Sequence, residues 1–390
     1  MQRRQFLKLA STAPLLPAFL RLPGTSSIEE KTLIVLQFSG GNDGLNTVVP
    51  YAHDAYHRAR PTLAISEREV LRIDKTLGLG FHPAFTPLRA LMEEGEMCVI
   101  NSVGYPNPDR SHFRSMDIWQ TGSGSADYWQ TGWLGRYLDH HGSGKPNHHA
   151  LDLDEGVSLA LRGEIRNGFA FGSTRQLDRT AKNRFHHAAV KRTTAQNHSE
   201  LHFLYKTLAD TQQSAAYLSE KSRSHAARAT YPGGKFGRDL KQIAELMTAG
   251  TDTRVYYAAL DGFDTHTRQA GRQQRLLKEY AEGVAALVED LKRHRLFDDT
   301  LILTFSEFGR RVAENAGGGT DHGTANNVFL MGGGLHRAGF YNDAPNLRNL
   351  NEGDLIHQVD FRSIYTDALG WLGVDATTVL GGRFAGLGIV

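Results

Sequence analysis

The chain has 390 residues, of which 40% are apolar and 22% are charged, so it can build the buried core of a globular protein. Its formal net charge is +2 and its lysines and arginines are scattered, which argues against nucleic acid as a partner. The single cysteine, Cys98, excludes an intramolecular disulfide and can supply at most one thiolate ligand to a metal.

The N-terminal stretch is typical of an exported protein. The segment QRRQFLK at residues 2–8 precedes a moderately apolar stretch and resembles a twin-arginine export signal. We therefore expect residues 1–27 to be a signal segment that the twin-arginine export machinery reads, and the protein to be periplasmic or secreted. The alternative is a basic amphipathic start without an address. No later stretch approaches the roughly 18 apolar residues of a membrane span, so no stable span is expected.

The remaining chain, 28–390, opens with the continuously apolar run TLIVLQF at 32–38. This run predicts a central parallel strand that is buried on both faces. A glycine-rich turn at 39–46 follows, and it contains Asp43. Because glycines let the backbone turn sharply, Asp43 would point into the crevice where open α/β sheets bind ligands. The alternative is an ordinary Asn-Asp-Gly turn without a function.

A second buried strand, at 96–103, leads through a proline-containing loop into a helix at 113–122. Ser111 lies at the start of that helix, where free N–H groups and the helix dipole favour an anion or an alkoxide. It is a candidate nucleophile, which needs a neighbouring metal or base to lower its pKa, or else a plain helix cap. His112 is a candidate proton donor to a leaving group, or merely an early helix residue.

The middle of the chain is the least strand-like part. The segment 201–221 is an amphipathic helix, and its surroundings predict a helical insertion or cap at about 175–250, packed beside the sheet. Trp119, Trp129 and Trp133 precede it. They are candidates for stacking on the sugars of a polysaccharide, although tryptophans more commonly belong to the core.

A third strand, RVYYAAL at 254–260, ends just before Asp264 and His266. Residues that stand two positions apart on an extended segment place their side chains on the same side, which suits two ligands of one metal. An amphipathic helix at 273–293 and a strand at 301–305 follow, so this part of the chain predicts a βαβ unit.

The strand LILTF at 301–305 ends in Ser306 and Glu307, and a glycine-rich loop with Asp321 and His322 leads to the strand NNVFLM at 326–331. Carboxylate oxygen and imidazole nitrogen are the ligands that zinc, manganese and similar ions accept. The polar clusters of the chain thus adjoin the carboxyl ends of strands in a mostly parallel sheet, where α/β folds place their sites. The predicted metal ligands are Asp43, Asp264, His266, Glu307, Asp321 and His322.

The order of these motifs resembles one family. GGNDG at 40–44, SHF at 111–113, D-x-H at 264–266, EFGR at 307–310 and DHG at 321–323 are similar to the motifs of the alkaline phosphatase superfamily, specifically its exported "domain of unknown function 1501" branch. The C-terminal VDFRSIYTDALGWLGV also looks like the helix that closes phosphatase and sulfatase domains. The resemblance implies an alkaline phosphatase-like three-layer sandwich with a mostly parallel central sheet, helices on both faces and a helical insertion.

The resemblance also implies roles for individual residues. Asp264, His266 and His322 would bind a first metal, Asp43 would bind a second, and Ser111 would attack the ester. The cofactor would be zinc, manganese or calcium, as one or two ions.

The chain departs from the superfamily at two positions. Glu307 stands where the superfamily has the Asp of an Asp-His pair, and Phe308 stands where it has the His, so the second metal site lacks a ligand. Arg310 and Arg110 are the nearest cationic candidates for binding ester oxygens, and each has a structural role as its alternative.

The expected function is an exported metal-dependent hydrolase that cleaves a phosphate or sulfate ester, with a small-molecule or polysaccharide ester as substrate. The alternative is an exported binding or assembly protein on the same scaffold, with a degenerate metal site and no catalysis.

Overall fold

A computed structural model describes residues 31–182 and 199–390 of the protein. The predicted signal segment at 1–27 lies outside the described residues. Within the two described ranges, no helix combines the length and the apolar character needed to cross a membrane.

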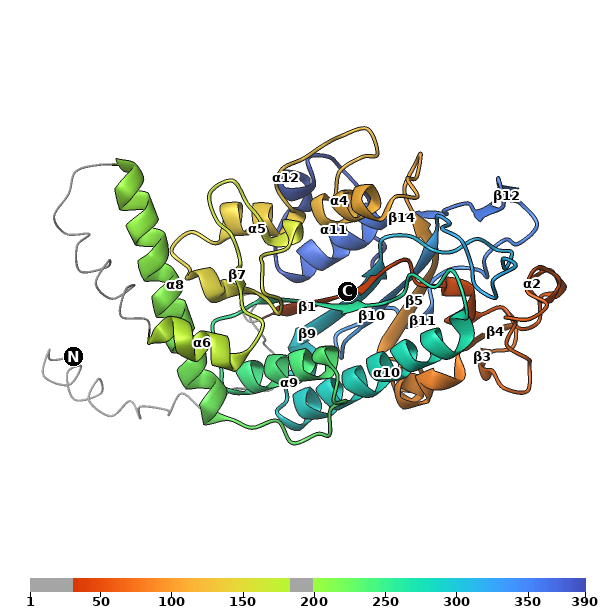
Figure 1. Cartoon of the computed structure of the whole chain (residues 1–390), viewed down its shortest axis with the longest axis horizontal. Helices are drawn as coiled ribbons and strands as arrows, with labels where there is room; N and C mark the ends of the chain where they lie inside the picture. The colour runs from red at the N-terminus through yellow and green to blue at the C-terminus, as the bar shows by residue number, and fades with distance from the viewer. Residues whose placement is uncertain (1–30, 183–198) are drawn as a thin grey trace, which may run out of the picture.

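The described residues form one large sheet of nine strands (Figure 1). Every pairing in the sheet is parallel except the two pairings of β10 (Asn326–Met331), which runs antiparallel to its neighbours β5 and β9. The strand order is β11 (Gly339–Phe340), β5 (Met97–Gly104), β10, β9 (Thr300–Ser306), β1 (Thr32–Ser39), β8 (Val255–Asp261), β6 (Ala150–Asp152) and β7 (Phe169–Ala170), and β14 (Val359–Asp360) pairs with β5.

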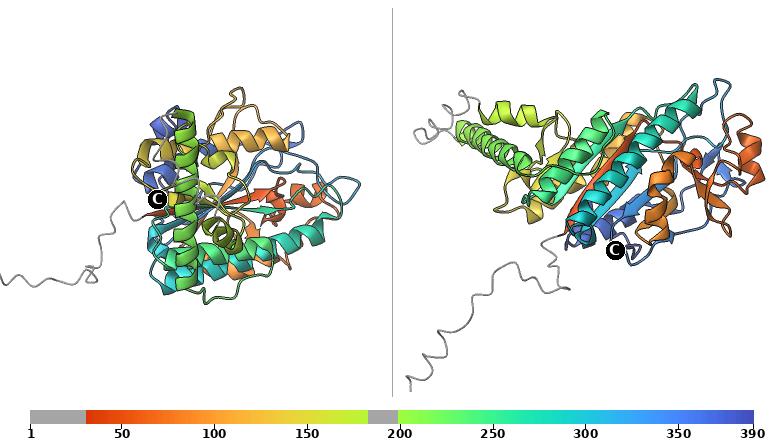
Figure 2. Two further views of the ribbon diagram at one scale, coloured as in Figure 1. Left: turned by 60° about the vertical axis from the view of Figure 1, so that its left-hand side comes forward. Right: turned by 90° about the horizontal axis from the view of Figure 1, so that it is seen from below.

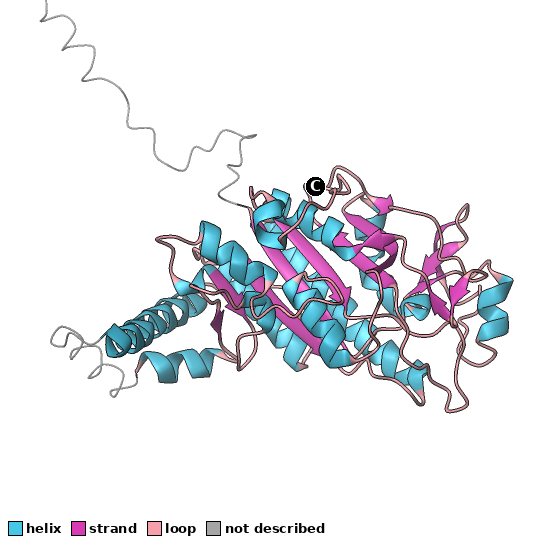
Figure 3. Cartoon of the chain, turned by 90° about the horizontal axis from the view of Figure 1, so that it is seen from above, coloured by secondary structure: helices cyan, strands magenta, loops and turns pink. Residues whose placement is uncertain are grey.

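Helices cover both faces of this sheet (Figures 1 and 3). One face carries α4 (His112–Thr121), α5 (Trp133–His141), α11 (Phe361–Trp371) and α12 (Ala376–Leu380), and the other carries α3 (Arg89–Glu93), α9 (Lys235–Thr248) and α10 (Gln269–Arg293). The pair α6 (Thr174–Ala181) and α8 (Ser199–Ser224) lies at the opposite end of the molecule from α2 (Asp54–Ala59) (Figures 1 and 2).

The alternation of side chains along β1 explains the three layers. Ile34 and Leu36 belong to the apolar core beneath α9 and α10, while Leu33 and Val35 belong to the core beneath α4, α5, α11 and α12. Successive strand side chains point to opposite faces, so a continuously apolar run is buried on both sides. The predicted α/β fold with a mostly parallel sheet and helices on both faces is confirmed.

The predicted strands agree closely with those observed, and two details need correction. The helix predicted at 273–293 begins one turn earlier, at Gln269. The strand NNVFLM, predicted as part of a parallel arrangement, is antiparallel to β9. Because β10 runs antiparallel to β9, the end of β9 and the start of β10 lie side by side. The two ends of the connecting loop 307–325 are therefore close together.

The predicted helical insertion at about 175–250 contains α6, α8 and α9. Of these, α9 packs against α10 and β8 and therefore forms part of the helical layer on the sheet. Two small sheets, β2 (Val48–Val49) with β4 (Leu79–Phe81) and β3 (Leu71–Asp74), and the hairpin of β12 (Leu350–Asn351) and β13 (Asp354–Leu355), lie at the end opposite α8 (Figure 3).

Candidate metal centre

Three segments far apart in the sequence meet at one edge of the large sheet. The extended segment after β8 supplies Asp264 and His266, the first residue of α4 is His112, and the loop between β9 and β10 supplies His322. In that loop, Arg310 and His322 form an antiparallel bridge, so the chain doubles back on itself directly after Glu307. The antiparallel direction of β10 is thus what returns His322 to the end of β9.

The side-chain atoms of these residues converge on one point. Asp264 Oδ1 lies 3.0 Å from His266 Nε2, 3.3 Å from His322 Nε2 and 3.6 Å from His112 Nε2. The Nε2 atoms of His266 and His322 are 3.0 Å apart. One ligand atom each from His112, Asp264 and His322 lie within 4.8 Å of one another, which is the spacing of donors around a single ion.

The opposite nitrogen of each imidazole ring contacts an acceptor. His112 Nδ1 lies 2.8 Å from Glu307 Oε1, His266 Nδ1 lies 3.2 Å from Asp321 Oδ1, and His322 Nδ1 lies 2.8 Å from the carbonyl oxygen of Arg110. Carboxylate and carbonyl oxygens only accept, so each ring can carry its proton on Nδ1, which is the tautomer that a metal bound at Nε2 would require. This arrangement leaves the three Nε2 lone pairs aimed at Asp264, as in zinc sites whose histidines are held by carboxylates and carbonyls.

The donor set fits a divalent cation. Three Nε2 lone pairs and a carboxylate oxygen would repel one another if nothing positive stood between them, and His112 Nε2 is buried without a hydrogen-bond partner. Nitrogen and oxygen donors of this kind suit zinc and manganese, and Asp264 with its histidines provides enough of them for one ion. Within the described part of the chain, His112, Asp264 and His322 form the group of side chains whose donor atoms lie close enough together to hold an ion.

The surroundings of Asp264 and His322 keep these two side chains in the form that binds a cation. Burial would raise the pKa of Asp264, but its hydrogen bond to Arg310 and the charge of that guanidinium prevail and hold the pKa at about 2. Burial lowers the pKa of His322, which keeps that ring neutral. The hydrogen bond to Glu307 raises the pKa of His112 and so makes its ring a stronger base and a better ligand.

The predicted metal ligands divide into three groups. Asp264, His266 and His322 lie together at the point of convergence, and the structure adds His112 to them. Glu307 is fully buried and accepts the N–H of Gly40 as well as that of His112, so its contacts place it behind the histidine.

Asp321 lies behind His266 in the same manner as Glu307 lies behind His112. Its Oδ1 contacts the Nδ1 atom of His266 and accepts from Asn315 Nδ2, and these hydrogen bonds lower its pKa, the one from Asn315 most strongly. Neither carboxylate is brought to the Nε2 side of the rings. Both hold a ring nitrogen in the orientation that a metal ligand needs.

Asp43 is not brought together with the other predicted ligands. Its Oδ2 accepts from Arg60 Nη1 at 2.6 Å and from the side-chain amide of Gln269, and both Asp43 and Arg60 are almost completely buried. The guanidinium therefore provides the positive charge for which the sequence suggested a second metal ion. Nothing in the segment AYHRARP distinguished Arg60 beforehand, because the partner lies 17 residues away in the chain.

Arg310 does not face an open site, which corrects its predicted contact with an ester oxygen. Its buried guanidinium donates to the carbonyl oxygens of Gly41 at 2.6 Å and Thr320 at 2.9 Å, and to Asp264 Oδ1 at 2.8 Å. It therefore ties three loops together and orients Asp264. Arg110 is engaged with Asp354 at 2.7 Å, while its carbonyl oxygen accepts from His322.

Ser111 lies where the sequence places it, at the start of α4 and next to His112. It is exposed, its side chain makes no capping hydrogen bond, and its backbone N–H donates to Asp109 at 2.6 Å. The hydroxyl is therefore not engaged in capping the helix. Its role as a nucleophile stays a prediction.

Phe308 fills the position where the sequence lacked a histidine. Its ring packs against the rings of His112 and His322, with centroid distances of 4.8 Å and 4.9 Å. Gly41 makes room for it, because a Cβ there would come within 2.2 Å of the phenyl ring and φ is +69°. An apolar ring thus shields two of the histidines and restricts their rotation.

Glu307→Gln should weaken binding of a divalent ion by about 10- to 100-fold, because the amide holds His112 with a weaker hydrogen bond and leaves it less basic. The amide oxygen of Gln can still accept from Gly40, so the fold should survive. Competition of the purified protein with a chelating dye for zinc measures this change. Glu352→Gln is the control, since Glu352 is largely exposed; equal affinities of the two variants would contradict the role given to Glu307.

The sequence profile of the family described as "Protein of unknown function (DUF1501)" matches residues 100–387, a range that includes His112, Asp264, His266 and His322 but not Asp43. No curated protein matches the chain.

Solved structures align with most of the chain at low sequence identity. A protein of the alkaline phosphatase superfamily from Vibrio parahaemolyticus is 12% identical, with 90% of this chain and 69% of that chain covered and a TM-score of 0.43. The phosphonate monoester hydrolase of Silicibacter pomeroyi is 9% identical, with 91% of this chain and 77% of that chain covered and a TM-score of 0.41. The C-terminal periplasmic domain of EcEptC from Escherichia coli, solved in complex with Zn, is 12% identical, with 77% of this chain and 72% of that chain covered and a TM-score of 0.37. Since the profile covers most of the chain, the protein belongs to the DUF1501 family.

Proposed function

We propose that the protein is an exported hydrolase that cleaves a phosphate or sulfate ester with the help of one divalent cation. The observation that supports this proposal is the convergence of three imidazole Nε2 atoms on Asp264 Oδ1, with every Nδ1 held by an acceptor. Such an arrangement binds a cation at defined positions and leaves exposed space beside it, since Asp264 and His266 are nearly half exposed. When bound, the ion would polarise an ester oxygen and lower the pKa of an oxygen nucleophile.

The residues of the chain divide the remaining work. His112, Asp264, His266 and His322 would hold the ion, and Arg310 keeps Asp264 charged and oriented. Ser111 would attack the phosphorus or sulfur atom, because its hydroxyl adjoins a ligand residue and stands at the positive end of the α4 dipole. The free N–H groups of the first turn of α4 would receive oxygens of the anionic ester group.

A single ion is favoured over two. Arg60 neutralises Asp43, and Phe308 supplies no ligand atom, so the described part of the chain gathers no second set of donors around Asp43. We therefore propose zinc or manganese in one copy. The export of the protein to the periplasm or beyond rests on the signal-like segment at 1–27 and belongs to the same proposal.

The test is elemental analysis of the exported protein, purified without chelator, followed by assays with phenyl phosphate and phenyl sulfate. We expect about one equivalent of zinc or manganese and turnover of one of the two esters. Metal binding without turnover of either ester would refute the hydrolase and support the alternative of a binding or assembly protein. Absence of a bound ion would refute both the metal centre and the hydrolase.

Ser111→Ala should retain the ion but lose at least about three orders of magnitude in kcat, because the attacking oxygen is gone while the ligands are intact. Ser125→Ala is the matched control, since Ser125 lies in the loop that follows α4 and contributes its carbonyl oxygen to Arg114. Activity and metal content should both be normal in the control. Undiminished turnover by Ser111→Ala would mean that another group, such as a water molecule, is the nucleophile.

A further inference from the structure

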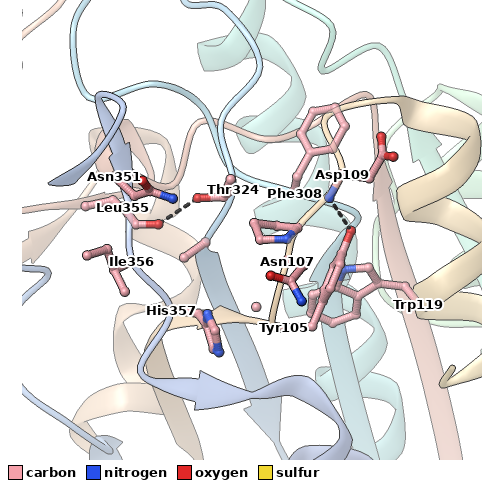
Figure 4. A pocket seen from close by; sticks show the side chains of 13 residues that line it. Tyr105, Asn107, Asp109, Trp119, Phe308, Thr324, Asn351, Leu355, Ile356 and His357 are labelled. Atoms are coloured by element: carbon pink, nitrogen blue, oxygen red, sulfur yellow. Dashed lines mark hydrogen bonds between the residues drawn. The ribbon is translucent and has the colours of Figure 1, made fainter. Parts of the chain in front are cut away.

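A cavity of about 200 Å³ lies beside the candidate metal centre (Figure 4). The end of β5 and the loop after it form one side, and the residues just before β10 together with the segment 351–357 form the other. Tyr105, Asn107, Trp119, Phe308 and His357 are among the residues that line it. Ligand pockets for whole drug-sized molecules span about 300 to 1,000 Å³, so this cavity suits one ring-sized part of a ligand.

The cavity is connected to the metal centre through two residues. Phe308 lines the cavity, and its ring also packs against His112 and His322, so one phenyl ring separates the cavity from two histidines of the centre. Asp109 also lines the cavity, and its Oδ1 accepts the backbone N–H of Ser111 at 2.6 Å. A molecule that is bound at the metal centre therefore has the cavity within reach of its adjoining part.

The charge of the lining disfavours an anion. No lysine or arginine is among the described residues that line the cavity, and Asp109 is its one carboxyl group. Burial lowers the pKa of His357, so this ring is neutral as well. The phosphate or sulfate of an ester would lose its hydration here without gaining a positive partner. An uncharged group meets no such penalty.

The lining does offer hydrogen-bond donors and apolar surface. Only 2% of the surface of Trp119 is exposed, and its Nε1 donor has no hydrogen-bond partner. A buried indole N–H usually has one. Phe305 and Phe361 stack on the two sides of the indole at 4.9 Å and 4.5 Å, so a ligand can meet only its edge. Figure 4 shows that edge beside Tyr105.

Side chains at the rim extend this environment outwards. Asn107 and Asn351 supply amide groups, and Ile356 is a large apolar residue of which 42% is exposed. Exposed large apolar side chains are few in the described chain, and another of them, Phe113, follows His112 directly and is 85% exposed.

We propose that this cavity binds an uncharged ring that carries a hydrogen-bond acceptor, and that this ring is the alcohol part of the ester whose anionic part binds at the metal centre. The proposal of the ring as part of an ester rests on the proposed function. An aromatic alcohol and a sugar share the required chemistry: both present a ring-sized apolar surface and an oxygen that can accept from a side-chain amide such as that of Asn107 or Asn351.

Direct binding tests the cavity without any turnover. The indole N–H resonance of Trp119, assigned by its loss in Trp119→Phe, is followed by NMR while phenol or methyl glucoside is added to the metal-loaded protein. We expect a saturable shift with one of these two neutral probes, because each has a ring that the cavity can take. The probe that shifts the resonance distinguishes an aromatic alcohol from a sugar. Absence of a saturable shift with both neutral probes would overturn the proposal.

Filling the cavity tests the connection to hydrolysis. Ile356→Trp should lower kcat/KM for phenyl phosphate at least about tenfold while leaving methyl phosphate unaffected, because only the phenyl ester has a ring to place in the cavity. Ile165→Trp is the matched control, since Ile165 is 75% exposed and does not line the cavity. Equal effects on the two esters, or no effect of Ile356→Trp on either, would overturn the assignment of the ring to the ester.

The two experiments separate the two proposals. A protein that hydrolyses neither ester but binds phenol at Trp119 retains the cavity and loses the proposed function. A protein that hydrolyses both esters with the same efficiency in every variant, and whose Trp119 resonance stays still, retains the function and loses the cavity.

Discussion

Asp264→Ala should leave a folded protein that binds no divalent ion and hydrolyses no ester. Asp264 Oδ1 is the atom on which the Nε2 atoms of His112, His266 and His322 converge, so its removal takes away the one carboxylate that the described residues bring to the point of convergence. Loss of a carboxylate that merely supports a ligand costs about 10- to 100-fold in affinity or activity, and loss of the ligand itself should cost more.

Elemental analysis and the ester assay measure the effect of Asp264→Ala, and circular dichroism verifies the fold. Asp261→Ala is the matched control, because Asp261 is an exposed carboxylate at the end of the same strand, β8. His322→Ala provides a second route to the same result, since it leaves the bond between Asp264 and Arg310 intact. A normal metal content in both Asp264→Ala and His322→Ala would remove the centre from this place.

Arg60→Met should lower the free energy of unfolding by about 3–5 kcal/mol. The Arg60 side chain is fully buried, donates to Asp43 at 2.6 Å and to Asn46 at 2.7 Å, and also donates to the carbonyl oxygens of Val312 and Arg311. Its removal would leave the Asp43 charge buried with an amide, from Gln269, as its remaining side-chain donor in the described chain. An unpaired buried charge destabilises the folded state by far more than the intact ion pair stabilises it.

Urea denaturation of the variants measures this cost. Arg58→Met is the matched control, because its contact with Asp54 is exposed and 3.9 Å long, and should change stability by less than about 1 kcal/mol. The double variant Asp43→Asn/Arg60→Met should lose less than the sum of the two single changes, since the buried charge is then absent. Additive losses would show that Asp43 and Arg60 do not form a coupled pair.

The variant Asp43→Asn also decides between the two roles considered for this residue. The structure predicts that the metal content stays at about one equivalent, because the ion pair with Arg60 lies apart from the convergent histidines. A loss of one equivalent from a starting content of two would establish the second metal site that the sequence suggested.

Much of the fold follows from local patterns in the sequence. The apolar runs at 32–38, 96–103, 254–260 and 301–305 are strands of the large sheet, because continuously apolar β-branched segments are stable only where both faces are covered. The amphipathic segment at 201–221 lies within α8. Cys98 is buried, as its apolar surroundings indicate. Each of these outcomes depends on side chains that are neighbours in the chain.

The sequence predicts which residues lie together at the candidate site, but not which contacts each of them makes. Asp264, His266 and His322 were recognised as donors because each stands next to a strand end, and strand ends of one sheet share an edge. Whether a carboxylate contacts the ion or supports a histidine depends on differences of a few ångströms. The sequence treats Glu307 and Asp321 like Asp264, whereas the structure places them on the Nδ1 side of His112 and His266.

Secondary structure, the position of the site edge and the residue types of the donors are therefore determined by the sequence, because periodicity and glycine placement act over a few residues. Only the tertiary structure decides the direction of β10 and the pairing of Asp43 with Arg60. It also places His112, which the sequence suggests as a proton donor, among the side chains that converge on Asp264. Each of them depends on long-range contacts between segments that the chain brings together on folding, and on the burial that makes an unpaired charge costly and a paired one tolerable.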